Sequence, residues 1–268
     1  MHARTLLACL LIGAAGPAAA AEAELHSFHC LHGCPVGAPA TDDTIVREIY
    51  TLSSNDITKL ADWVAYRVTR ETIGKSQSRN WETDPWLADE ETLSPADYAE
   101  AAATLHIDRG HQAPLASFSA ARTAADTNIL SNITPQAAAL NQGPWVRLET
   151  RERGLAHETG KGVYVYTGPL FERLMRPLPK TSEMHRVPSG YWKVVATEDG
   201  RMSAFIFDQS ARRQDDHCGG RVTLKELQLR ARLILFPRGP GSFSSLDSAL
   251  GCPGPMPAPA PPAEIPRP

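Results

Sequence analysis

Residues 191–208 read YWKVVATEDGRMSAFIFD, and this stretch decides the fold class. Apolar residues dominate positions 191–197 and recur through positions 202–208, which is typical of two β-strands. The sequence EDG at positions 198–200 favours a tight turn, and a connection this short can join only antiparallel strands. The stretch therefore predicts a β-hairpin within an antiparallel sheet.

Outside this hairpin, strand and helix patterns follow one another irregularly. A regular alternation of strands with helices would indicate a parallel sheet, and the sequence has no such alternation, internal repeat or interior linker. We therefore expect an α+β fold, with flanking helices around a central antiparallel sheet, in a single domain over residues 22–252. Further strands are expected at residues 45–52, 59–69 and 163–167, and helices at residues 97–105 and 224–232.

A further helix is expected to begin close to Asn141. Proline lacks a backbone N–H and is tolerated only in the first turn of a helix, so Pro144 limits how far upstream this helix extends. Gly160 should end it. Residues 132–135 should form the loop that leads into the helix, and a short strand-like step before that loop should end in a turn at Gly110.

The composition is that of an ordinary folded protein. The chain has 268 residues, of which 42% are hydrophobic, and its formal net charge is −3. A disordered tail protein would carry fewer hydrophobic residues and a higher net charge. A tight, electrostatically driven binder of nucleic acid would be strongly basic. An enzyme that must release nucleic acid remains compatible with this charge.

Both ends of the chain differ from the rest. Residues 1–21 combine a short positive start, an apolar run and small residues before a cleavage point, as in a signal peptide. Because no later apolar run is long enough to cross a bilayer, we expect a secreted or periplasmic protein without stable membrane association. Residues 253–268 read PGPMPAPAPPAEIPRP, and we expect this proline-rich tail to be disordered.

Export changes the interpretation of the cysteines. Four follow the signal peptide, namely Cys30, Cys34, Cys218 and Cys252, and an even number in an oxidising compartment implies two disulfides. Three pairings are open, and pairing by proximity would join Cys30 to Cys34 and Cys218 to Cys252. The histidines around Cys30 and Cys34 leave a transition-metal site as an alternative, although oxidation of these cysteines would remove its soft ligands.

The stretch DRGHQAP at residues 108–114 carries the first candidate for catalysis. Gly110 allows a close backbone approach and brings Arg109 and His111 together. A histidine can take a proton from water near neutral pH, and the planar guanidinium of arginine matches phosphate oxygens. A general base beside an arginine that can bind phosphate suggests phosphoryl chemistry. The alternative is that both are ordinary surface residues.

The second candidate lies in the helix that begins near Asn141. Glu149 is two turns along this helix, and Arg153 is four residues beyond Glu149, at the spacing of a helical ion pair. Considered alone, such a pair is typical of a solvated helix face. Arg79 adds a further cation from the upstream loop SRNWETDP, where Trp81 is a candidate for stacking on a base.

These segments together resemble the DNA/RNA non-specific endonuclease family. The motifs ADWVAYRVTR, RNWETDP, LSPADY, DRGHQAPLA, SNITPQ, LNQGPWVRLE, TGPLFER, YWKV and FDQ occur in the family's order over residues 30–252. DRGH followed by SNITPQ and LNQG is a specific signature. The resemblance implies an α+β fold with a ββα-metal finger set on the central antiparallel sheet, and it implies the proximity pairing of the cysteines.

The resemblance also implies a role for each candidate residue. His111 would be the general base, Asn141 the one direct protein ligand of a hydrated Mg²⁺, and Glu149 would hold water bound to that metal. Mn²⁺ would substitute for Mg²⁺, and two copies of the chain would form a homodimer. Arg79 and Arg109 would contact the phosphate, and Arg153 would support the same region. Asn132 would help to order His111 or the substrate.

This assignment has chemical consequences. A general base contributes only about 10²–10⁴ to a rate, so the cation and the arginines must supply most of the rest. Mg²⁺ keeps several of its waters, which suits a single amide ligand, whereas zinc prefers several His or Cys ligands. We therefore expect an exported endonuclease that hydrolyses single- and double-stranded DNA and RNA to 5′-phosphate products. Two alternatives are a narrower phosphodiesterase at the same site and a non-catalytic nucleic-acid-binding module that retains the fold.

Overall fold

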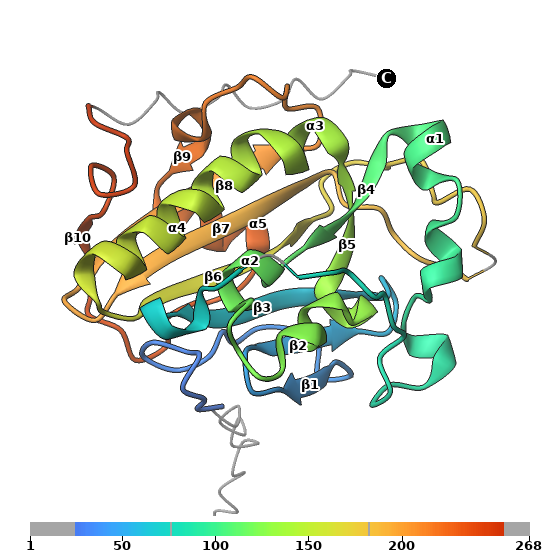
Figure 1. The fold of residues 1–268 in the computed structure, drawn as a ribbon, viewed down its shortest axis with the longest axis horizontal. Coiled ribbons are helices and arrows are strands. Elements are labelled where there is room, and N and C mark those ends of the chain that lie inside the picture. The colour runs from blue at the N-terminus through green and yellow to red at the C-terminus, as the bar shows by residue number, and fades with distance from the viewer. Residues whose placement is uncertain (1–24, 76, 182, 255–268) are drawn as a thin grey trace, which may run out of the picture.

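A computed structural model of the protein describes residues 25–75, 77–181 and 183–254 and centres on one large sheet (Figure 1). Its strands are β1 (Asp43–Val46), β2 (Thr51–Asn55), β3 (Leu60–Val68), β6 (Val163–Leu170), β7 (Gly190–Thr197), β8 (Arg201–Asp208), β9 (Arg221–Val222) and β10 (Ser244–Ser245). They are ordered β1-β2-β3-β6-β7-β8-β10, with β9 also paired to β8. Every pair is antiparallel except β10 with β8. The structure confirms an α+β fold around a central antiparallel sheet.

The hairpin that the sequence predicts is formed by β7 and β8, which pair along their whole length. Gly200 lies in the connecting turn with φ +80°, a conformation that glycine adopts without strain. The single strand expected at residues 45–52 is wrong. A turn closed by the hydrogen bond from the Arg47 N–H to the Tyr50 carbonyl (2.9 Å) divides this segment between β1 and β2.

The sheet is covered on both faces. Helix α4 (Val146–Thr159) crosses one face, and helix α5 (Leu224–Ala231) lies against the other (Figure 1). Side chains alternate between the two faces along each strand, so in β7 Tyr191 packs in the core beneath α4 and Trp192 packs in the core beneath α5. Because both faces are buried, the strand sequence is almost continuously apolar.

A second, smaller sheet holds the DRGH sequence. Strand β4 (Ile107–His111) pairs antiparallel with β5 (Ile133–Ala137). The turn predicted at Gly110 and the loop predicted at residues 132–135 are therefore wrong, because pairing between these distant segments overrides their local turn propensity. The glycine is required here for a close approach, since a Cβ at Gly110 would collide with the side chain of Gln136.

The helix after β5 begins earlier than expected and continues through its proline. Helix α3 (Ala138–Leu140) leads into a π-helical turn (Asn141–Trp145), which leads into α4. Gly143 in this turn has φ −117° and ψ −118°, so the helix widens where Pro144 would otherwise clash with the preceding turn. Together β4, β5 and these helical segments form the ββα unit that the resemblance implies (Figure 1).

The helix expected at residues 97–105 is divided in two. A 3₁₀ turn at Pro95–Tyr98 is followed by α1 (Ala101–Leu105), and Glu100 between them has φ +61°. The remaining helices are α2 (Leu115–Phe118) and 3₁₀ turns at Arg70–Thr72, Asp89–Glu91, Ala124–Asn128, Leu130–Asn132 and His217–Gly220.

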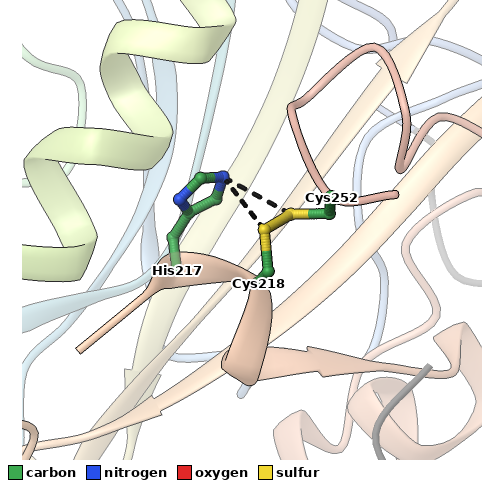
Figure 2. Close-up of side chains that lie close together, drawn as sticks. All are labelled: His217, Cys218 and Cys252. Carbon is green, nitrogen blue, oxygen red and sulfur yellow. Dashed lines mark hydrogen bonds between the residues drawn. A yellow bond between two sulfur atoms is a disulfide. The ribbon is translucent and has the colours of Figure 1, made fainter. Parts of the chain in front are cut away.

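Both disulfides follow the pairing by proximity. Cys30 is bonded to Cys34, and Cys218 is bonded to Cys252. Figure 2 shows His217 beside the second bridge, with its Nε2 3.6 Å from one sulfur and 3.4 Å from the other. Because both sulfurs are in a disulfide, this cluster does not present the thiolates that a zinc site requires.

Within the described residues, the histidines near the first bridge do not form a group that could hold a metal ion. His29 is buried, with its Nδ1 2.8 Å from Thr51 Oγ1 and its Nε2 3.1 Å from the Glu48 carbonyl oxygen. Burial lowers the pKa of His29 to about 4, which is typical of a neutral, structural imidazole. Both ring nitrogens already contact the protein, and Cys30 and Cys34 are oxidised.

The expected signal peptide and residues 255–268 of the proline-rich tail lie outside the described residues. Within the described part of the chain, no helix combines the length and the apolar character needed to cross a membrane.

Candidate active site

Most of the expected catalytic residues meet in one cleft of about 530 Å³. The cleft lies between β4, the π-helical turn with the first half of α4, and the loop that carries Arg79. These segments are far apart in the chain: the ββα unit brings β4 and the helical segments together, and the loop with Arg79 lies beside that unit. The expected site residues that line the cleft are Arg79, Arg109, His111, Asn141, Glu149 and Arg153.

His111 ends β4 and faces this cleft. Its Nε2 lies 3.0 Å from Asn128 Oδ1, so the Nε2–H donates to the amide oxygen and Nδ1 holds the lone pair. Removal from water lowers the pKa of His111 from 6.5 to about 4; the bond to Asn128 opposes this shift, and the positive charge of Arg79 adds to it. The ring is therefore neutral at neutral pH and able to accept a proton.

Asn132 is not part of the cleft lining, although the resemblance implies that it orders His111 or the substrate. It is fully buried, and its Oδ1 accepts the Ala113 N–H at 2.8 Å. Its Nδ2 donates to the carbonyls of Ala113 and Thr127, at 2.9 and 2.8 Å. Asn132 therefore ties the chain after His111 to the segment that carries Asn128. The direct partner of His111 is Asn128, which has no motif around it and was missed by sequence analysis.

Trp81 packs against both His111 and Arg109. Its ring centroid is 5.3 Å from that of His111. The Arg109 guanidinium lies 5.5 Å from the centroid of Trp81 and 5.3 Å from that of Tyr98, and it donates to the Pro95 carbonyl at 2.8 Å. Arg109 is thus held by aromatic faces and a neutral carbonyl. Its positive charge stays available for an anion in the cleft.

Two further arginines complete the basic lining. Arg79 is exposed and makes no hydrogen bond or ion pair with other described residues. Arg153 Nη2 donates to Thr150 Oγ1 at 2.9 Å, and its Nη1 is buried without a partner. The Glu149–Arg153 ion pair that the helical spacing allows is not formed within the described residues. The cleft therefore contains guanidinium groups that form no ion pair with a carboxylate of the described residues, and such groups can bind phosphate oxygens.

Asn141 lies in the π-helical turn and is fixed by Asp108. Its Nδ2 donates to Asp108 Oδ2 at 2.9 Å, and Gln142 Nε2 donates to the same oxygen at 2.8 Å. Since the amide nitrogen is used in this way, Oδ1 of Asn141 is the atom left to bind a ligand. Sequence analysis did not assign a role to Asp108, although it is the first residue of the DRGH motif.

Glu149 is a buried residue of the cleft wall, one helical turn before Arg153 on the same face of α4. Its Oε1 lies 3.7 Å from Lys193 Nζ on β7. Burial raises the pKa of Glu149 to about 6, the positive charge of Lys193 opposes this shift, and the negative charge of Glu152 adds to it. The carboxylate is therefore ionised at neutral pH.

Lys193 belongs to a buried polar network that sequence analysis missed. Its Nζ lies 3.2 Å from Glu152 Oε1, donates to Tyr66 Oη at 3.3 Å, and is 4.1 Å from the Trp145 ring centroid. Tyr66 in turn donates to Glu152 Oε2 at 2.9 Å. A buried charge costs several kcal/mol unless it is paired, and here it is paired. A lone lysine within the apolar strand YWKVVAT is the signal that could have found it.

The lining suits a hard divalent cation. Asn141 Oδ1 and the Glu149 carboxylate offer oxygen atoms, which Mg²⁺ prefers. Among the residues that line the cleft, His111 is the one histidine and none is a cysteine. Zinc would require several such nitrogen or sulfur ligands, so the residues present fit a largely hydrated Mg²⁺ better than zinc.

Residues 32–240 of this chain match the family model described as DNA/RNA non-specific endonuclease. The chain belongs to this family. The chain is similar to the nuclease of Serratia marcescens, at 44% identity over 241 residues that cover 87% of this chain and 91% of that protein. It is also similar to mitochondrial endonuclease G of Bos taurus, at 34% identity over 149 residues that cover 54% of this chain and 46% of that protein.

The family fold is also seen in a solved structure. The crystal structure of the EndoG/EndoGI complex contains a chain whose fold matches that of this protein with a TM-score of 0.65. The match covers 77% of this chain and 91% of that chain, at 20% sequence identity. At this identity the likeness shows the shared fold alone.

Proposed function

We propose that this family member is an exported, Mg²⁺-dependent endonuclease that hydrolyses phosphodiester bonds of single- and double-stranded DNA and RNA. It would leave 5′-phosphate and 3′-hydroxyl ends. The observation that carries the proposal is the meeting of a neutral histidine, three arginines without carboxylate partners and two oxygen ligands in one cleft. A binding module would use the arginines but would have no need of a histidine held with its basic nitrogen unprotonated.

In this proposal His111 takes a proton from the attacking water. With Nε2–H bonded to Asn128 Oδ1, the proton is accepted at Nδ1, and Asn128 then stabilises the imidazolium. A pKa of about 4 makes the free enzyme's histidine a weak base. The negative charge of a bound phosphate would raise that pKa, because an anion nearby favours the protonated ring.

The arginines bind the phosphate and stabilise the negative charge that develops on it. Arg109 is suited to this role because its aromatic and carbonyl contacts hold the guanidinium before the substrate arrives. When bound at Asn141, with Glu149 holding its water, Mg²⁺ would add positive charge beside the same phosphate and the leaving oxygen. A general base accelerates the reaction by only about 10²–10⁴-fold, so the arginines and the metal must supply the rest of the rate acceleration.

The breadth of the proposed substrate range follows from the roles of these side chains. Each of them would act on phosphate, water or metal, whereas base sequence is recognised at base edges in the grooves. Water is the nucleophile, so a ribose 2′-hydroxyl is not needed. The same site would therefore cut both DNA and RNA.

Digestion of matched DNA and RNA oligonucleotides tests this function. With Mg²⁺ both should be cut to products with 5′-phosphate ends, and EDTA should abolish cleavage until Mg²⁺ or Mn²⁺ is restored. Cleavage restricted to RNA, or products ending in 2′,3′-cyclic phosphate, would contradict the proposal.

The metal assignment has a separate test with a matched control. Asn141→Ala should shift half-saturation of activity to a higher Mg²⁺ concentration, because it removes the amide oxygen that is proposed to bind the metal. Gln142→Ala removes the neighbouring amide, which shares Asp108, and should leave the Mg²⁺ titration unchanged. An unchanged titration in Asn141→Ala would remove this residue from the site.

Export and self-association belong to the same proposal. Two disulfides are typical of an oxidising compartment, and residues 1–21 have the composition of a signal peptide. The homodimer that the resemblance implies stays a prediction.

A further inference from the structure

Arginines without a carboxylate partner are concentrated around α4. Elsewhere in the described structure, exposed arginines commonly pair with acidic side chains, as in Arg173–Asp208 and Arg230–Glu172. Around the cleft and α4, by contrast, the arginines without such a pair within the described residues are Arg79, Arg109, Arg147, Arg151, Arg153 and Arg213. Because the whole chain has a net charge of −3, this is a local concentration of positive charge rather than a general property of the surface.

These arginines lie on both sides of a narrow helical ridge. Val146 and Thr150 are exposed residues of α4. On one side of this ridge, Arg153 lines the catalytic cleft. On the other side, Arg147 and Arg151 line a second groove of about 600 Å³. Val146 lines both the cleft and the groove, so the ridge of α4 alone separates them.

Arg147 is held rigidly in the second groove by neutral groups. Its Nη2 donates to the Arg213 carbonyl at 2.8 Å and also donates to the Asp215 carbonyl. Two backbone carbonyls fix the position of the guanidinium, which forms no ion pair with a carboxylate of the described residues. The Arg147 side chain is therefore ordered before a ligand binds, so less conformational entropy is lost on binding.

Arg151 lies one helical turn further along the same groove. It is exposed and makes no hydrogen bond or ion pair with described residues. A Cβ on Gly251 would lie 2.8 Å from its Nε, so the guanidinium rests against the backbone at that glycine. The groove contains one carboxylate, Asp216, which lies 3.2 Å from Nδ1 of His217 rather than beside either arginine.

We propose that α4 is a duplex-binding ridge: the strand to be cut lies in the catalytic cleft, and Arg147 and Arg151 bind phosphates of the complementary strand in the second groove. This inference rests on the proposed nuclease function. A duplex has two rows of phosphates on either side of a groove, and a helix with cations on both sides can contact both rows. A single strand has one row, which the cleft would occupy. Arg147 and Arg151 therefore act on duplex substrates only.

Equilibrium binding in EDTA tests this inference without cleavage. The probes are a labelled DNA duplex and its labelled strand alone, measured by fluorescence anisotropy over a range of salt concentrations. The double variant Arg147→Ala/Arg151→Ala should raise the Kd for the duplex by roughly 10-fold or more at about 0.1 M salt and lower the slope of log K against log salt by about 2. The Kd for the single strand should not change.

Matched variants separate this effect from a loss of fold. Arg151→Ala removes a side chain without bonds to described residues, so it should keep the fold and lower the duplex salt slope by about 1. Arg232→Asn removes an exposed arginine that follows α5, on the opposite face of the sheet. Asn tolerates the φ of +58° at this position. This variant should change neither binding curve. Arg153→Ala, in the cleft, should weaken binding of both probes.

The outcomes are distinct. Selective loss of duplex binding in both the double variant and Arg151→Ala supports the ridge. An equal loss for the duplex and the single strand, or no loss for the duplex, overturns it while leaving the nuclease function intact. A wild-type protein that binds neither probe overturns the proposed function together with this inference.

Discussion

The two faces of the central sheet are built from the same strands but bury different chemistry. Beneath α5 the core is apolar, with Trp192 of β7 packed in the same cluster as Leu227 of the helix. Beneath α4 the next residue of the same strand is Lys193, fully buried against Glu152 and near Glu149. Replacing a buried ion pair by apolar residues is often neutral or stabilising, so the α4 face is not the arrangement that maximises stability.

We infer from this difference that the α5 face contributes to stability alone, whereas the α4 face combines an apolar core with the polar groups of the candidate site. The period-two alternation of a strand lets neighbouring residues of β7 serve the two purposes independently. Changes beneath α5 should therefore alter stability alone, whereas changes on the α4 face should alter activity in ways that stability does not account for.

The largest expected effect is on the α4 face. His111→Ala should lower the specific activity by at least about 10²-fold, because the general base is lost while the partly exposed ring contributes little to the core. Activity is measured with Mg²⁺ on plasmid DNA, and circular dichroism checks the fold. His157→Ala, which removes an exposed histidine from the last turn of α4, should be close to wild type. A near wild-type rate for His111→Ala would refute its role as base.

Lys193→Met should have the next largest effect. It leaves Glu149 and Glu152 buried without their counter-charge, which should lower the free energy of unfolding by about 3–5 kcal/mol. The double variant Lys193→Met/Glu152→Gln should recover much of this stability but not the activity, because Glu149 still lacks its partner.

Leu227→Ala, beneath α5, makes the matched comparison for Lys193→Met. It should cost about 2–5 kcal/mol through the cavity it creates and leave the specific activity of the folded protein unchanged. Urea denaturation and activity assays on the same samples measure both quantities. If Leu227→Ala reduced specific activity as strongly as Lys193→Met, the division between the two faces would be wrong.

The two disulfides extend the comparison, because Cys252 packs in the core beneath α4 and Cys34 in the core beneath α5. The bridge to Cys252 spans 34 residues and the bridge to Cys34 spans only 4. From loop entropy, serine substitutions should cost about 3–4 kcal/mol for the long bridge and about 2 kcal/mol for the short one. Thermal unfolding of each double-serine variant measures which bridge contributes more to stability. A larger loss for the short bridge would contradict this account.

The smallest expected effect concerns pH. Glu149, with its pKa raised to about 6, should be ionised at neutral pH and take up a proton as the pH falls through about 6. Protons would then compete with Mg²⁺, and the apparent Kd for the metal should rise by up to about tenfold per pH unit below that value. His111 should stay neutral until about pH 4. Calorimetric Mg²⁺ titrations measure this dependence, and Glu149→Gln should remove it.

Local signals predicted the regular elements and failed where distant segments pair. The β7–β8 hairpin, β3 and α5 were predicted because hydrophobic periodicity and turn residues act over a few positions. The turn at Gly110 and the loop at residues 132–135 were wrong, because these segments become β4 and β5 only by pairing with each other. Likewise, the helix begins before Asn141, and not close to it as expected, because a π-helical turn accommodates Pro144.

By itself, the sequence determined the family, through motifs such as DRGH and LNQG, and it determined the residue types from which a phosphate and metal site can be made. Only the tertiary structure decided their neighbours. Helical spacing allowed Glu149 to pair with Arg153, but Lys193 reaches it from a strand and leaves Arg153 without a carboxylate. In the same way His111 takes Asn128 as its partner. Spacing along a chain specifies which side chains share a face, whereas burial and long-range packing select which distant group lies opposite them.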